Sequence, residues 1–153
     1  MPLVPSDLAT RLEQEWLSQF PDSAMQSGDL FAGAVSGWFV SAMAGAFPCI
    51  TAQPRRPQLT AAAATALEVG VGPTSGALLA LAVASYYAGQ LFGAGVATFP
   101  TALPAGMGLM TTALIDLNMP TPTRANLIAQ GCHAMAISTI VVFPTPIPPA
   151  PIV

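Results

Sequence analysis

The feature that most restricts this sequence is the stretch between Glu68 and Asp116, in which 47 consecutive residues carry no formal charge. A surface exposed to water needs polar groups, and so long a stretch supplies few of them. Charged residues make up only 7% of the chain, against about 25% in an ordinary soluble protein. We therefore expect much of the exterior to be buried, either against other protein chains or in lipid.

The same composition argues against two other classes of protein. The net charge is -3, there is no lysine, and the four cations do not form a cluster large enough to neutralise a phosphate backbone. We therefore expect no nucleic-acid partner. Disorder goes with low hydrophobicity and high charge, whereas 53% of these residues are apolar. A length of 153 residues predicts a single folded domain.

Helical periodicity predicts a mainly α-helical domain over residues 1–143, with four to six helices. Leu8, Leu12 and Trp16 recur at helical spacing after Ser6, which is a good N-cap residue. Later Phe-Pro pairs are expected to end helices, because proline disfavours helical geometry in the residue before it. The expected helices cover residues 6–20, 27–47 or 29–47, 59–69, 109–118 and 124–137, and a long helix ends at 98 after a cap at Thr74 or Ser75.

The C-terminal segment "STIVVFPTPIPPAPIV" predicts a short β-strand followed by an extended proline-rich tail over 144–153. The β-branched run 139–142 favours a strand, and the prolines favour a polyproline II conformation. We expect Val141, Val142 and Phe143 to add to an exposed sheet edge of a neighbouring chain. Pro144 and Pro146 would begin a preformed docking segment whose binding costs little conformational entropy.

Small residues repeat at intervals of four in two of the expected helices, and the series around Gly37 has its counterpart around Gly89. Side chains four apart share one helix face, and small ones allow close packing against another helix. The glycines that we assign to such interfaces are Gly33, Gly37, Gly45, Gly89 and Gly93. In this correspondence Gly45 matches Ala97. It indicates either an internal duplication of 29–69 and 81–118 or chance in a chain rich in alanine and glycine.

Arg55 and Arg56 form the densest positive feature, in a loop bracketed by Pro54 and Pro57. One interpretation is that they pair with acidic groups of a neighbouring subunit, which would place both in an interface. The other is a solvated loop. The sequence leaves both interpretations open.

We expect no metal, no cofactor, no small-molecule substrate and no catalytic residue. Cys132 and His133 are adjacent, but a metal site needs three or four ligands and Cys49 is the only other cysteine. A buried histidine is the simpler interpretation. Whether the two cysteines are bonded to each other stays open, and a small enzyme is a third class of function.

The overall organisation resembles small virion structural proteins of tailed bacteriophages, such as baseplate and neck components of contractile tails. Alanine-rich helices with few charges, followed by a β-branched run and "FPTPIPPAPIV", carry the resemblance. It implies a non-enzymatic assembly subunit located in the virion, whose partners are copies of itself and other virion proteins. Deletion of 144–153 is then expected to impair assembly and to leave the helix content nearly unchanged.

The alternative is a small integral membrane protein with helical spans at about 30–47 and 76–99. Both segments are uncharged and long enough to cross a bilayer. However, Tyr86, Tyr87 and Gln90 fall in the middle of the second segment, and no lysine or arginine closely flanks it. Recovery only from the membrane fraction would favour this alternative.

Overall fold

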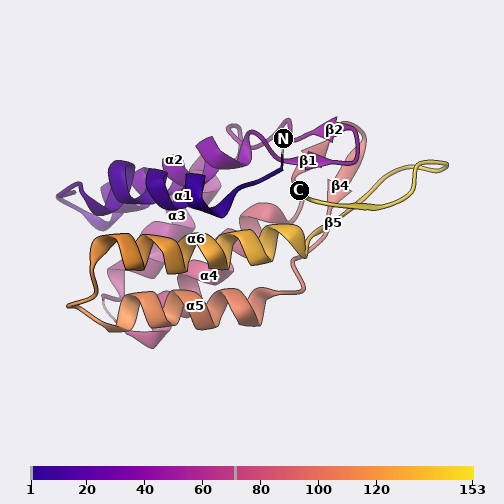
Figure 1. Ribbon diagram of the computed structural model, residues 1–153. Helices are drawn as coiled ribbons and strands as arrows, with labels where there is room; N and C mark the ends of the chain where they lie inside the picture. The colour runs from indigo at the N-terminus through magenta and orange to yellow at the C-terminus, as the bar shows by residue number, and fades with distance from the viewer. Residues whose placement is uncertain (1, 71) are drawn as a thin grey trace.

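Helices lying side by side form most of the molecule, and short strands gather at one end of them (Figure 1). The computed structural model describes residues 2–70 and 72–153, and six α-helices occur in this part of the chain. The prediction of a mainly helical fold with four to six helices is therefore confirmed. The helices are α1 (Pro5–Leu12), α2 (Ala24–Phe39), α3 (Arg56–Glu68), α4 (Pro73–Tyr87), α5 (Leu103–Ile115) and α6 (Thr121–Ile137), and a π-helical turn, η1 (Glu13–Leu17), extends α1.

The two long helices that the sequence predicts are each a shorter helix followed by a β-hairpin. Helix α2 ends at Phe39 and α4 ends at Tyr87, so the predictions through 47 and 98 were wrong. The first hairpin is β1 (Met43–Ala44) with β2 (Phe47–Pro48), and the second is β3 (Leu91–Phe92) with β4 (Gly95–Ala97). Gly45 and Gly93 allow the reversal, because their φ angles of 59° and 61° lie in the left-handed region that favours glycine.

The chain is built from three helix–hairpin–helix units. The first unit is α2–β1–β2–α3, and the second is α4–β3–β4–α5. The third consists of α6, β5 (Ile140–Val142) and β6 (Ala150–Pro151), and α1 packs on α6 in place of a following helix. The hairpin turns make Gly45 equivalent to Gly93, whereas the sequence comparison matched Gly45 with Ala97. The duplication itself stays a prediction.

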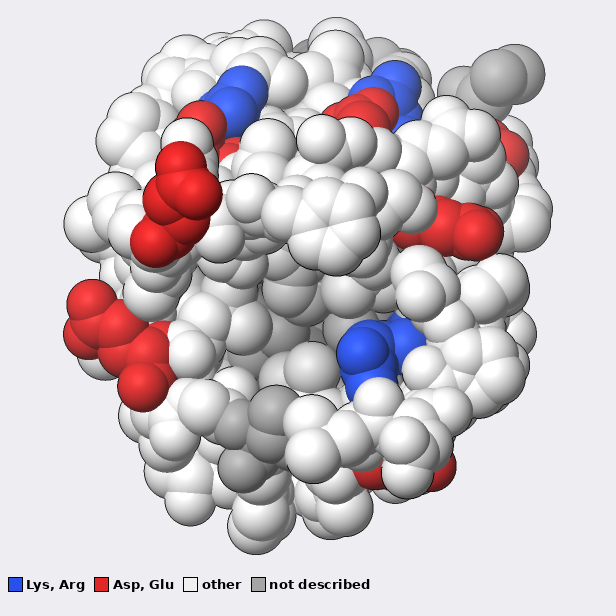
Figure 2. All heavy atoms as spheres, turned by 90° about the vertical axis from the view of Figure 1, so that its left-hand side faces the viewer, with Lys and Arg blue, Asp and Glu red and all other residues white. Residues whose placement is uncertain are grey.

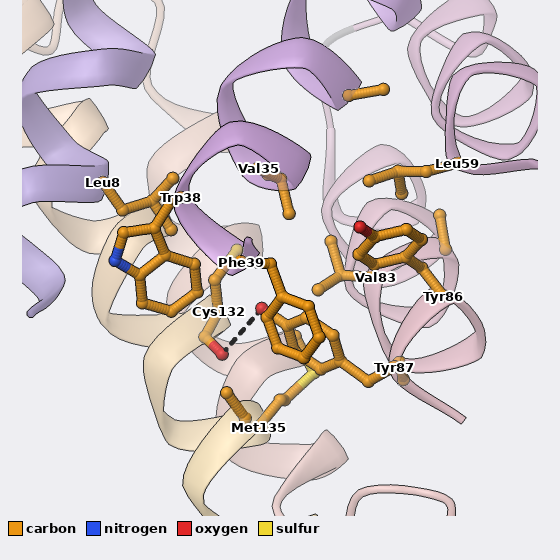
Figure 3. Close-up of a cluster of buried hydrophobic side chains, with 14 of the residues drawn as sticks. Leu8, Val35, Trp38, Phe39, Leu59, Val83, Tyr86, Tyr87, Cys132 and Met135 are labelled. Carbon is orange, nitrogen blue, oxygen red and sulfur yellow. Dashed lines mark hydrogen bonds between the residues drawn. The ribbon is translucent and has the colours of Figure 1, made fainter. Parts of the chain in front are cut away.

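The three helices that precede the hairpins bury the same positions in the same order. The central residues are Phe31, Val35 and Phe39 in α2, Leu79, Val83 and Tyr87 in α4, and Ile128, Cys132 and Ala136 in α6, and all nine are fully buried. Phe39 and Tyr87 stack with ring centroids 4.7 Å apart. The Tyr87 hydroxyl donates to the Cys132 carbonyl at 3.2 Å (Figure 3). The core therefore lies where these three helices meet.

Close approach between helices occurs at Gly28 and Gly76, which are equivalent in the first two units. A Cβ built on Gly28 would lie 2.7 Å from the Ala64 nitrogen in α3, and one built on Gly76 would lie 2.5 Å from the Thr111 Cα in α5. Neither contact leaves room for a side chain. The corresponding position of the third unit is Ala125, and its partner helix α1 passes into the π-helical turn η1. Close helix packing within this chain therefore occurs at Gly28 and Gly76, and the interface role of the other glycines stays a prediction.

The remaining helices fill the spaces between the three central ones. Helix α3 packs between α2 and α4, α5 between α4 and α6, and α1 between α6 and α2. Side chains also fasten neighbours together: the Trp38 indole donates to the Val4 carbonyl at 2.9 Å, and the Ser75 hydroxyl donates to the Ala66 carbonyl at 3.0 Å. The six helices therefore form a closed ring.

The segment after 143 does not extend away from the domain as an open tail. It leaves the body as a loop and returns as β6, which pairs with β5 in the register Ile140↔Pro151 and Val141↔Ala150. Ile152 is fully buried in the same hydrophobic core as the helices. The structure therefore differs from the expected division at 143/144, because burial of Ile152 draws the end of this segment back into the domain.

Candidate functional site

The three hairpins join into a closed six-stranded barrel at the end of the helical ring. Within each hairpin the strands pair directly, and between hairpins three equivalent contacts close the circle: Cys49↔Phe92, Ala97↔Val141 and Ala44↔Ile152. Equivalent hydrogen bonds accompany them: Ile50 N to Leu91 O at 2.9 Å, Thr98 N to Ile140 O at 2.8 Å, and Val153 N to Met43 O at 2.9 Å. The barrel therefore repeats the three-unit arrangement of the helices.

Strand alternation divides the barrel residues into an inner and an outer set. Successive side chains of a strand point to opposite faces. Six buried residues belong to the inner set: Ala44, Cys49, Phe92, Ala97, Val141 and Ile152. The outer set, which we call the barrel belt, is exposed or half-buried and consists of Met43, Pro48, Ile50, Leu91, Val96, Thr98, Ile140, Val142, Pro151 and Val153. Thr98 is the only polar side chain in the belt, and none of the belt side chains is charged.

A proline-rich loop over 143–149 projects from the third hairpin beyond the barrel (Figure 1). Phe143 anchors its start, because its ring lies 5.0 Å from that of Phe47 and covers Gly95, which has no Cβ to obstruct it. Every residue from Pro144 to Pro149 is exposed. The barrel belt and this loop together form an uncharged, largely apolar end of the molecule.

Charged side chains concentrate away from this end. Figure 2 looks onto the opposite end of the helical ring, where acidic and basic side chains lie around the rim. Residues 30–54, 69–115 and 125–153 include all six strands and contain no Asp, Glu, Lys or Arg. The two ends of the molecule therefore present different chemistry to a partner.

Three residues predicted to add as a strand to a neighbouring sheet lie in different environments. Val141 is buried inside the barrel, Val142 is half exposed in the belt, and Phe143 is buried under the loop. Strand β5 is paired on both sides, with β4 through Val96↔Val142 and with β6. A foreign strand could reach β5 only by displacing one of these neighbours. Pro144 and Pro146 lie in the exposed loop.

The predicted arginine pair serves the fold of its own chain. The Arg55 guanidinium donates to the carbonyl of Ser85 in the last turn of α4 at 3.4 Å and to that of the C-cap residue Ala88 at 2.7 Å. A cation at a helix C-terminus is favoured by the helix dipole. Arg56 forms an ion pair with Asp29 at 3.0 Å. Both arginines are half-buried by these contacts, and their pairing with another subunit stays a prediction.

The predicted interface glycines face these cations or lie in turns. A Cβ built on Gly33 would lie 3.1 Å from Arg56 Nη2, one on Gly37 would lie 3.0 Å from Arg11 Nη1, and one on Gly89 would lie 3.3 Å from Arg55 Nη1. Gly45 and Gly93 each begin a two-residue turn at the outer end of the barrel. Within this chain, three of these glycines leave space for a guanidinium group, and the other two adopt the backbone conformation of a hairpin turn.

A buried polar cluster joins the first two units behind the barrel. Gln90 is fully buried; its side-chain oxygen accepts from the Thr51 hydroxyl at 2.5 Å, and its amide donates to the Tyr86 carbonyl at 2.9 Å. The Tyr86 hydroxyl donates to the Ala52 carbonyl at 2.7 Å. Burial raises the pKa values of Tyr86 and Cys49, so both stay neutral at pH 7. The cluster fastens two hairpins together, and its neutral groups are those of a structural network.

The Cys132–His133 pair lies at the boundary between the core and the surface of the helical ring. Within the described residues, no three or more His, Cys, Asp or Glu side chains lie close enough to hold an ion. Cys132 is fully buried and His133 is half-buried against Trp38, with ring centroids 6.5 Å apart. Both cysteines carry free thiols, so no disulfide joins them.

A shallow apolar groove of about 260 Å³ lies between α3 and α4 on the side of the helical ring. Ala62, Leu78 and Leu81 are among the residues that line it. Thr65 and Ser85 add two hydroxyl groups to this otherwise apolar lining, and none of the lining residues is charged.

Comparison of the chain with protein-family models, with curated proteins and with solved structures gave no match.

The barrel belt is the main feature that sequence reasoning missed. Its signal was present: Gly45-Ala46 and Gly93-Ala94 are the same dipeptide, flanked by apolar residues on both sides in each case. A glycine at the first position of a two-residue loop is typical of a type II′ hairpin. Alanine-rich surroundings gave the same residues a helical appearance.

Proposed function

We propose that this protein is a non-enzymatic structural subunit of a multi-protein particle, in the manner of a phage tail, baseplate or neck component. The observation that carries the proposal is the uncharged barrel end, where the barrel belt surrounds a closed barrel and the loop 143–149 projects from it. Exposed apolar surface on this scale marks a protein–protein contact in many proteins. Its partners would be copies of the chain and other structural proteins of the particle.

The distribution of charge supports an assembly role for one end in particular. Removing apolar surface from water stabilises an interface by about 25 cal/mol per Å². Burying a charge there costs free energy unless the charge is paired. The barrel belt can bury apolar surface without burying a charged side chain, whereas the helical end carries both signs of charge. The barrel end is therefore the surface that would be buried, and the helical end the one that would remain in water.

The two segments that the membrane alternative predicts as helical spans are not continuous helices in this fold. Residues 30–47 and 76–99 each include a helix end and most or all of a hairpin. Among the described residues, none of the helices combines the length and the apolar character needed to span a bilayer. This finding does not favour the alternative. Expression without detergent still separates the two proposals, since recovery only from membranes would support the alternative.

The experiment is the native mass of the purified chain by light scattering after size-exclusion chromatography, with two matched variants. Val142→Glu places a charge in the barrel belt, and Leu117→Glu places the same charge on the opposite end, at a residue that is 73% exposed. The wild type is expected to be oligomeric, Val142→Glu to lower the mass, and Leu117→Glu to leave it unchanged. Circular dichroism should show the same helix content in all three.

A stable wild-type monomer would contradict the proposal. So would an oligomer that tolerates Val142→Glu but dissociates with Leu117→Glu. Deletion of 144–153 is a less specific test than the sequence indicates, because it also removes Ile152 from the core. A point substitution in the barrel belt leaves that core in place.

A further inference from the structure

The third hairpin differs from the first two in one respect that closing the barrel does not require. In the first two hairpins, the innermost pairs Ala44↔Phe47 and Phe92↔Gly95 enclose only a Gly-Ala dipeptide. The equivalent pair of the third hairpin, Val141↔Ala150, encloses residues 142–149. The first two units show that a two-residue turn suffices at this place in the fold.

The added loop is nearly independent of the body. Beyond the anchor at Phe143, residues 144–149 are all exposed, and four of the six are prolines. The Ile147 nitrogen donates to the Pro144 carbonyl at 3.1 Å, within the loop itself. Proline-rich chain favours an extended polyproline II conformation over one that turns back. The loop is therefore a connector that is suited to being straight, yet here it reverses.

Strand β6, which follows the loop, occupies a slot between two other strands. Ile152 donates from its nitrogen to the Thr139 carbonyl at 3.1 Å on one side. On the other side, Met43 and Val153 exchange two hydrogen bonds of 2.9 Å each. Ile152 fills the inner face of the barrel and is fully buried. All these contacts are made by residues 150–153 alone, so they can be reproduced whichever chain supplies the segment.

We propose that the segment 150–153 is exchanged between copies, so that β6 of one chain closes the barrel of the next. The inference rests on the proposed assembly function and specifies how two copies join. Exchange of an identical element re-forms the same core and the same hydrogen bonds. The equilibrium between the closed and the exchanged arrangement therefore depends on the connector and on the association of the chains. The proline connector favours the open arrangement, and the uncharged barrel belt favours placing two barrels side by side.

The reach of the connector is sufficient for such an exchange. Extended polyproline II chain spans about 3.1 Å per residue, so residues 144–149 reach about 19 Å. Strands in neighbouring barrels that touch through their belts lie within this distance, because packed sheets lie about 10 Å apart. Phe143 stays anchored on Phe47 and Gly95, which makes Pro144 the point where the chain would leave its own barrel.

The test uses two variants that each carry one added cysteine and a different tag, coexpressed and then mildly oxidised. Ile140→Cys and Pro151→Cys place thiols on opposite members of the pair Ile140↔Pro151, on the outer face of the barrel. In a closed monomer, these two thiols belong to different molecules and stay apart. Exchange brings them together, and a mixed-tag disulfide dimer is the expected result on non-reducing gels.

The matched control is the pair Leu91→Cys and Val96→Cys, which occupies the corresponding positions of the second hairpin. Its two-residue turn does not permit exchange, so this pair should give no mixed dimer above the background from random belt contacts. The native thiols Cys49 and Cys132 are buried and should not contribute.

A second variant gives an independent readout. Replacing 142–149 by Gly-Ala, the turn of the other two hairpins, should abolish exchange and lower the native mass. If the wild type is oligomeric and Val142→Glu dissociates it, yet the 140/151 pair gives no more mixed dimer than the 91/96 pair and the short turn keeps the mass, exchange is wrong and the assembly function stands. A monomeric wild type contradicts both.

Discussion

The third unit of this molecule has the helix and hairpin that the first two units have, but its hairpin also carries a long loop. Comparing the three units shows which features the fold requires. All three units bury equivalent residues in their central helices and contribute a hairpin to one barrel. The first two units also have a glycine at the helix contact and a two-residue turn in the hairpin. The third has Ala125 at the helix contact, Cys132 where the others have valine, and an exposed proline-rich loop. The comparison shows that the scaffold is the shared part, and that the loop is an addition to it.

The largest expected effect is that of replacing Ile152, the residue of the third hairpin that is buried in the core after the loop. Ile152 is larger than Cys49 and Ala97, the residues at the equivalent positions of the other two hairpins. Ile152→Ala should lower the free energy of unfolding by about 3 kcal/mol, through lost burial and the cavity that remains. Urea unfolding followed by circular dichroism measures this change. Val153→Ala, at a residue that is 42% exposed, is the control and should change little.

A loss for Ile152→Ala no larger than that of Val153→Ala would mean that β6 is not part of the folded core.

The equivalence of the first two units is tested at their helix contacts. Gly28→Ala and Gly76→Ala each push a methyl group against the backbone of the partner helix, which should destabilise the protein by about 2 kcal/mol in each case. Gly108→Ala is the control, because a Cβ there meets nothing within 4 Å. That control should be stabilising by about 1 kcal/mol through helix propensity.

The same unfolding measurement applies to all three glycine variants. If only one of Gly28→Ala and Gly76→Ala is destabilising, the two units are not packed alike.

The smallest expected effect concerns Cys132, which stands where Val35 and Val83 stand in the other units. Burial raises the pKa of the Cys132 thiol from 9.0 to about 12. Below pH 9 the Cys132 thiol is protonated in both the folded and the unfolded chain, and its contribution to the free energy of unfolding is fully present. As pH rises from 9 toward 12, the unfolded chain loses the proton and the folded chain keeps it. Stability should therefore fall by about 1.4 kcal/mol per pH unit from this group.

Cys132→Val, which restores the pattern of the other units, should reduce the slope of stability against pH above 9 and change stability little at pH 7. Burial also raises the pKa values of Cys49, Tyr86 and Tyr87, so a residual slope above pH 9 is expected in both proteins. An identical slope in the variant and the wild type would contradict the assignment to Cys132.

Part of this fold could be predicted from the sequence, because some patterns act within one helix. Leu8, Leu12 and Trp16 mark a buried helix face that the structure confirms. The positions of the hairpins could not be predicted in this way. A two-stranded hairpin is marginal by itself, and Met43–Pro48 is a strand pair only because β3 and β6 hydrogen-bond to its edges. The candidate site was missed for the same reason, since the barrel belt exists only once three distant hairpins have closed.

By itself, the sequence determined the helical class of the fold and the absence of charge from its hairpin regions. Both follow from composition and from short-range periodicity, which act whatever the rest of the chain does. Only the tertiary structure decided that 143–153 returns to its own core, and that the uncharged residues encircle one end of the molecule. These outcomes depend on hydrogen bonds between segments that are far apart along the chain, such as those of Ile50 with Leu91 and of Met43 with Val153.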